Sequence, residues 1–157
     1  MTSLIPWLLL IHLAGVMIGL GPTFIFARIT SEGARAPEHA RFTTNLVRQL
    51  SSQWSHPLAL TVLLSGAGLT WLGGYDLLAV RWLLVSIILF VPSFAYAALV
   101  QNKDIGRILE LTANGPAGLT PEASAELGRR RRRARRGGQY MRLTALTILV
   151  LMVMKPF

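Results

Sequence analysis

The stretch Leu4–Ala27, LIPWLLLIHLAGVMIGLGPTFIFA, decides the fold class because it contains no Asp, Glu, Lys or Arg. At about 1.5 Å per residue, a helix of this length crosses the roughly 30 Å hydrocarbon core of a bilayer. The segment lacks the basic start of a signal peptide, since Met1–Trp7 carries no Lys or Arg. We therefore expect a retained transmembrane helix.

Three further apolar segments follow, at about 57–75, 77–100 and 140–155. Lipid offers backbone groups no hydrogen-bond partner, so segments of this composition are expected to be helical. We predict an all-α fold, a four-transmembrane-helix bundle forming one integral membrane domain over 1–157. Amphipathic aromatic residues lie near the expected ends of the spans, as membrane interfaces favour: Trp7, Trp54, Trp71, Tyr75, Trp82 and Tyr140.

The basic residues predict the orientation. The chain is 52% hydrophobic yet carries a formal charge of +9, and these charges concentrate in two connections, at about 28–56 and 101–139. The connection between the second and third spans has Arg81 alone, balanced by Asp76. The positive-inside rule then gives an N-out/C-out, multi-pass protein with two cytoplasmic connections. We expect it in a bacterial inner (plasma) membrane, in contact with the lipid bilayer.

Both cytoplasmic connections are predicted to be partly helical. Phe42, Leu46, Leu50 and Trp54 form a stripe at every fourth residue, so this helix either extends span two or lies on the bilayer surface. In the other connection, Lys103–Ala113 continues span three, and Asn114, Gly115, Pro116 and Gly118 are expected to end it.

A second helix is expected to begin in that connection, with Thr120 as N-cap and Pro121 at its first position. We expect it to run into span four, with a break or kink near Gly137-Gly138. In span one, Gly19, Gly21 and Pro22 predict another kink, because proline lacks the amide that would bond back along the helix.

His12 is the most informative polar residue, because an ionisable side chain within the membrane must face the bundle and find a partner. Gly15 and Gly19 share its helical face. One interpretation is a site for haem b, with His12 as the iron ligand and bare backbone beside the flat ring. The other is helix packing, with Gly15-x-x-x-Gly19 admitting a neighbouring helix and His12 hydrogen-bonding across the bundle.

Seven arginines precede span four: Arg129, Arg130, Arg131, Arg132, Arg133, Arg135 and Arg136. No aromatic residue is interleaved with them and a membrane span follows closely, so we expect no nucleic-acid binding. They are predicted to fix the topology and to bind anionic lipid headgroups.

The sequence lacks the residues and motifs that several classes of enzyme and metal site require. The chain has no Cys, which excludes disulfides, thiolate metal sites and cysteine nucleophiles. It also has no Walker loop, G-x-S-x-G elbow, H-E-x-x-H motif or carboxylate pair. No catalytic residue is therefore assigned, and a methionine copper site would have few donors.

The motifs Leu9-x-x-His12-x-x-Gly15, Pro57–Gly66 (PLALTVLLSG) and Val80–Val85 (VRWLLV) resemble a group of small bacterial four-helix membrane proteins. The nearest resemblance is to the family called domain of unknown function 2269. The chain more distantly resembles CopD-like copper-resistance proteins and HemJ-type protoporphyrinogen oxidases. In HemJ-type proteins the first-helix histidine is associated with haem, which implies that role for His12.

Arg81 stands where HemJ-type proteins have a lysine at the start of the third helix. Arginine stays charged where a buried lysine can lose its proton, so the resemblance implies at most a haem-linked role for Arg81. We favour a non-enzymatic helical membrane component or subunit that packs with itself or another membrane protein. A b-type haem protein or haem-linked oxidoreductase using His12 is the alternative. Copper or small-solute transport ranks below both.

Overall fold

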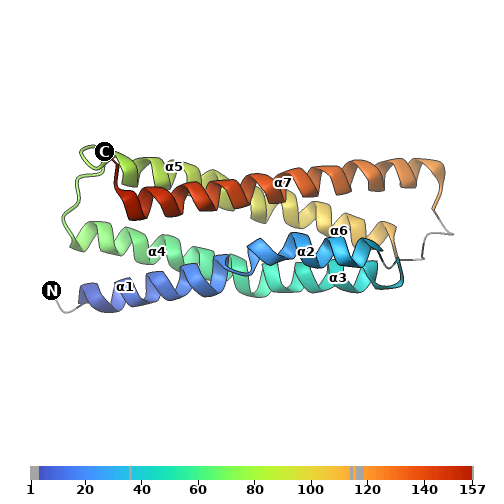
Figure 1. Ribbon diagram of the computed structural model, residues 1–157, viewed down its shortest axis with the longest axis horizontal. Helices are drawn as coiled ribbons and strands as arrows, with labels where there is room; N and C mark the ends of the chain where they lie inside the picture. The colour runs from blue at the N-terminus through green and yellow to red at the C-terminus, as the bar shows by residue number, and fades with distance from the viewer. Residues whose placement is uncertain (1–3, 36, 114, 116–118, 157) are drawn as a thin grey trace.

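The computed structural model describes residues 4–35, 37–113, 115 and 119–156, and the regular secondary structure of these residues is entirely helical. Four long rods lie side by side (Figure 1). The first rod contains α1 (Leu4–Gly15), the π-helical turn η1 (Val16–Leu20) and α2 (Thr23–Arg35). The second contains α3 (Pro37–Leu50), the π-helical turn η2 (Ser51–Ser55) and α4 (His56–Leu72).

The first two rods form one helical hairpin, and the other two rods form a second. The third rod contains α5 (Arg81–Tyr96), the π-helical turn η3 (Ala97–Gln101) and α6 (Asn102–Leu111), and the fourth is the single helix α7 (Pro121–Met154). Three stretches are long and apolar enough to cross a membrane: Leu4–Gly33, Arg81–Leu111 and Pro121–Met154. The structure thus shows a helical fold with three candidate spans.

The bundle has an apolar half and a charged half. The 34 residues of α7 extend about 51 Å as a helix, whereas a bilayer core measures about 30 Å. The half that contains α1, α4, α5 and the end of α7 has many exposed apolar side chains. Figure 1 shows both chain ends at this end, and α2, α3, α6 and the start of α7 at the other.

Packing within the apolar half runs mainly in pairs, α1 against α4 and α5 against α7. In the charged half, α2 packs on α3, α6 packs on α7, and α3 also contacts α6. The two hairpins therefore meet chiefly in the charged half. Aromatic residues mark the far end of the apolar half, where Trp7 and Trp71 are exposed and Lys155 lies over the Trp82 ring at 5.7 Å.

The expected kink in the first rod is confirmed, since Gly21 and Pro22 form a turn between η1 and α2. The stripe helix of the first connection continues directly into span two through η2, so it extends the span. The helix of span three likewise continues through η3 into α6. It ends at Leu111, and Asn114, Pro116 and Gly118, which were expected to end it, lie outside the described residues.

Thr120 caps α7 as predicted, because its Oγ1 accepts a hydrogen bond from the Ala123 amide at 3.3 Å, with Pro121 at the helix start. The break expected at Gly137-Gly138 is wrong, since α7 runs through both glycines. Gly137 serves packing, because a Cβ there would lie 2.6 Å from both Gln101 Oε1 and Tyr96 Oη. A glycine is tolerated within a helix where a neighbouring group leaves no room for a side chain.

The third span begins later than the sequence predicted. Residues 77–80 belong to the connection after α4, and α5 begins at Arg81. Gly74 adopts a positive φ of 65° just beyond α4, a conformation that glycine allows without strain. Asp76 Oδ1 then accepts the Leu78 amide at 2.9 Å. This local turn competes with helix formation despite the apolar character of Leu77–Val80.

Candidate functional site

His12 joins the first helix pair of the apolar half. Its Nδ1 lies 3.0 Å from the Val62 carbonyl oxygen and 3.1 Å from Ser65 Oγ, both on α4. Ser65 Oγ donates to the Thr61 carbonyl at 2.7 Å. Nδ1 is therefore the donor to α4, and the lone pair of the ring is on Nε2.

Glycines make the approach of α1 and α4 possible. A Cβ on Gly15 would lie 2.9 Å from Val62 Cγ2, and a Cβ on Gly19 would lie 2.6 Å from Leu58 Cβ. Gly66 lies against the imidazole ring, since a Cβ there would approach His12 Cε1 at 3.2 Å. The face shared by His12, Gly15 and Gly19 is thus covered by α4, an arrangement that favours the helix-packing interpretation.

Arg81, which was also named for haem, does not belong to the helix pair that holds His12. Arg81 is exposed at the start of α5, which packs along α7 and so belongs to the other helix pair. Among the described residues there is no group of three or more His, Asp or Glu that could hold a metal ion. The bare backbone that a flat ligand would need beside His12 is occupied by Leu58 and Val62.

The arginine cluster divides into inward and outward members. Arg130 Nη1 lies 2.7 Å from Asp104 Oδ1, and Arg133 Nε lies 2.7 Å from Asp104 Oδ2. The Asp104 side chain, on α6, has no exposed surface. The contact at Oδ1 is a directed hydrogen bond, whereas the contact at Oδ2 is an ion pair without a well-aligned one.

A second set of ion pairs continues this contact toward the tip of the charged half. Arg107 Nε on α6 donates to Glu126 Oε1 on α7 at 3.1 Å, and Arg130 Nε donates to the same oxygen at 3.2 Å. The hydrogen bond from Arg107 lowers the pKa of Glu126 below its usual value. The hydrogen bond to Asp104 raises the pKa of Arg130. Cation and anion therefore alternate across the α6–α7 contact.

Asp104 was not singled out from the sequence, although a signal exists. Asp104 and Ile108 are four residues apart in α6 and both are buried. They therefore share the helical face that packs on α7. An acidic residue on the apolar face of an amphipathic helix, in a chain rich in arginine, predicts a buried ion pair.

The remaining arginines of the cluster are exposed: Arg129, Arg131, Arg132, Arg135 and Arg136. Arg135 and Arg136 lie four to five residues before Tyr140, or about 6–8 Å along the helix, close enough for long side chains to reach an interface. Lipid binding by these residues stays a prediction. Arg130 and Arg133 are committed to Asp104 and are less available for headgroups.

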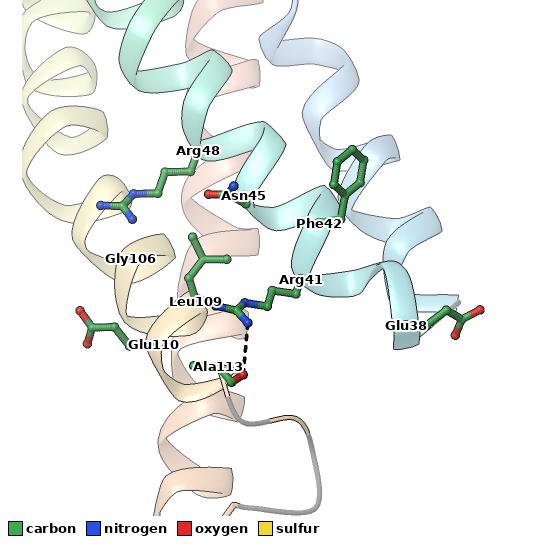
Figure 2. A pocket seen from close by; sticks show the side chains of 9 residues that line it. All are labelled: Glu38, Arg41, Phe42, Asn45, Arg48, Gly106, Leu109, Glu110 and Ala113. Carbon is green, nitrogen blue, oxygen red and sulfur yellow. Dashed lines mark hydrogen bonds between the residues drawn. The ribbon is translucent and has the colours of Figure 1, made fainter.

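An open groove of about 700 Å³ lies between α3 and α6 in the charged half. Figure 2 shows Arg41 and Arg48 between the two helices, Phe42 on the α2 side of α3, and Gly106, Leu109 and Glu110 on α6. Arg41 Nη1 donates to the Ala113 carbonyl at 3.2 Å, which ties α3 to the end of α6. The groove is thus lined by apolar residues and by charged residues of both signs.

Comparison with known proteins gives one family. The family model described as "Predicted integral membrane protein (DUF2269)" matches residues 6–156, nearly the whole chain. The searches of curated proteins and of solved structures gave no match.

Proposed function

Since the chain belongs to the DUF2269 family of predicted integral membrane proteins, we propose that it is a non-enzymatic helical component of the bacterial inner membrane with four spans. The fourth span beyond the three candidates is α4. It packs along α1 at the same level, and its outer residues Leu60, Leu64 and Trp71 are exposed. An apolar helix in this position meets lipid on its outer face.

We propose an N-out/C-out orientation. All exposed arginines except Arg81 lie in the half of the bundle that excludes both chain ends, and the positive-inside rule puts that half in the cytoplasm. A reporter that is active only in the periplasm should be active when fused after Phe157 and inactive when fused after Leu119. Activity at Leu119 with inactivity at Phe157 would reverse the orientation.

The observation that supports the non-enzymatic role is the hydrogen bonding of His12 to α4. Its Nδ1–H is directed at Val62 O and Ser65 Oγ of α4, and Gly15, Gly19 and Gly66 shape the surfaces around it. An ionisable residue in a membrane span is expensive unless it bonds across the bundle. Here that bond joins α1 to α4, so the residue acts in assembly.

His12→Asn provides the test because an asparagine amide nitrogen can occupy the position of Nδ1. For the packing role we expect His12→Asn to melt near the wild-type temperature in detergent and His12→Ala to melt lower. Interhelical hydrogen bonds in membranes are worth about 0.6–2 kcal/mol. Equal melting temperatures for His12→Ala and wild type would contradict the assembly role.

Haem b is the second candidate, and one observation favours it: Nδ1 bonded to a carbonyl leaves the Nε2 lone pair in the tautomer that ligates metals. The glycine face, however, is filled by α4 and does not fit a flat ring. An absorption spectrum of the purified protein separates the two roles. A Soret band lost in both His12→Asn and His12→Ala would establish haem, whereas the packing role predicts no such band in any variant.

A further inference from the structure

Arg142 is a charged residue within the apolar part of α7. It lies two residues beyond Tyr140, whose hydroxyl accepts a hydrogen bond from Ser93 Oγ of α5 at 3.2 Å. From Leu143 to the end of α7 at Met154 no charged residue follows. Arg142 is half-buried, and a cation at this level of a membrane span is costly unless it is paired.

The acidic residues that the structure describes do not supply that pairing. Their ion pairs lie in α2, in α6 and in the first part of α7, and none of these pairs includes Arg142. The nearest acidic residue on α7 is Glu126, sixteen residues earlier. That separation is about 24 Å along a helix. The counter-ion of Arg142 is therefore expected from outside the chain.

The direction of α7 carries the Arg142 side chain toward the lipid headgroups. Helical side chains tilt toward the N-terminus of their helix, and the N-terminal part of α7 lies in the charged half (Figure 1). Gly137 lies beside Tyr96 and Gln101, where α5 passes through η3 into α6. Arg142 is five residues from Gly137, about 7.5 Å along the helix. A long arginine side chain can extend over that distance to reach polar surroundings.

Arg135 and Gln139 share the helical face of Arg142, because they precede it by seven and three residues. Both are exposed. The same face continues in the apolar half with Leu146 and Leu149, which are 46% and 53% exposed. Hydrogen-bond donors thus lie directly beyond an apolar surface on one side of one helix. A guanidinium binds phosphate oxygens through parallel hydrogen bonds, and a phospholipid combines such a phosphate with acyl chains.

We propose that Arg142, Gln139 and Arg135 bind the phosphate of one anionic phospholipid, whose acyl chains lie along Leu146 and Leu149. Arg142 pairs with the phosphate from the membrane side, and the other two residues contact the headgroup from the water side. A lipid with a net negative charge is favoured because the site brings two cations to one headgroup. The inference rests on the proposed placement of α7 in the membrane.

Lipid binding to the purified protein in detergent tests the proposal. Native mass spectrometry would follow the lipid-bound fraction as phosphatidylglycerol, an anionic lipid, is added. We expect Arg142→Gln to weaken this binding about fivefold, the contribution of one basic residue near an anionic surface. Arg135→Gln should act similarly at an exposed position where the fold is not at risk, and Arg142→Lys should retain part of the affinity. Phosphatidylcholine, a zwitterionic lipid, should bind more weakly than phosphatidylglycerol.

Arg129→Gln is the matched control, because Arg129 is exposed on the same helix thirteen residues, or about 20 Å, before Arg142. Equal losses in Arg129→Gln and Arg142→Gln would overturn the proposal, since they would indicate general attraction between charges. Displacement of the lipid by an excess of inorganic phosphate would also overturn it, by identifying a site for a soluble anion. Flotation of the wild type with vesicles of phosphatidylcholine alone tests the membrane placement of α7 separately, because insertion does not require an anionic lipid.

Discussion

Asp104 shows how one residue orders the charged half of the bundle. Its carboxylate is completely buried and has two arginine partners from α7, whose side chains retain 33% and 58% exposure. The arginines can therefore regain water if the carboxylate is removed, whereas the carboxylate cannot if the arginines are removed. The energetic consequences of the two changes should differ for this reason.

We predict that Arg130→Ala combined with Arg133→Ala destabilises the protein more than Asp104→Asn does. An uncompensated carboxylate at this buried position costs about 3–5 kcal/mol. Adding Asp104→Asn to the double variant should recover part of the loss. The melting temperature in detergent would be measured for the wild type, the double arginine variant, Asp104→Asn and their combination. Arg132→Ala with Arg135→Ala removes the same charge from exposed positions and should change little. Equal losses in the two double variants would contradict the pairing.

The carboxyl group of Glu126 should make the stability of the fold depend on pH in the acidic range. Its pKa is lowered in the folded protein, chiefly by the hydrogen bond from Arg107. A lowered carboxyl pKa gives stability that is present above the unfolded pKa and is lost as the pH falls through the folded pKa. We expect the melting temperature to fall below about pH 4.5, the ordinary pKa of a glutamate carboxyl group. Glu126→Gln should weaken this dependence and Glu122→Gln should not, and salt should reduce the effect.

At the scale of elements, the paired glycines of α7 perform different roles. A Cβ on Gly137 would meet Tyr96 Oη and Gln101 Oε1 at 2.6 Å, whereas a Cβ on Gly138 would meet only Gln101 Nε2 at 3.9 Å. Alanine favours a helix over glycine by about 1 kcal/mol, but overpacking costs about 1–3 kcal/mol. We therefore predict that Gly138→Ala raises the melting temperature and Gly137→Ala lowers it. Two increases would show that α5 is free to move away from α7.

The capping signals explain why element boundaries were partly predictable. Thr120-Pro121 carries both a side-chain acceptor and a residue without an amide, so the start of α7 is encoded locally. The start of α5 was placed too early because Leu77–Val80 is apolar, and hydropathy does not reveal the Asp76 side-chain bond to the Leu78 amide. Turn chemistry decided that boundary.

At the scale of the whole molecule, the bundle is longer than a bilayer is thick. We predict that a membrane-impermeant maleimide modifies Phe42→Cys and Ser124→Cys once the cytoplasmic side is accessible. It should leave Leu64→Cys and Leu149→Cys unmodified in membranes, because lipid covers these residues. A mass shift on denaturing gels measures the modification. Labelling of Leu64→Cys as fast as Phe42→Cys would show that the apolar half is not in lipid.

The local properties of this protein follow from short stretches of the sequence. Apolar length, helix caps and Pro22 fixed membrane character, helicity and the turn after η1, because each acts over a few neighbouring residues. Contacts between residues that are distant in the chain, by contrast, become visible only in the folded bundle. His12 on Val62 and Ser65, Gly137 beside Tyr96, and Asp104 between Arg130 and Arg133 depend on how helices distant in the chain are rotated toward one another. That rotation is a property of the packed bundle, so the arginine run read as one cluster in the sequence became two groups in the fold.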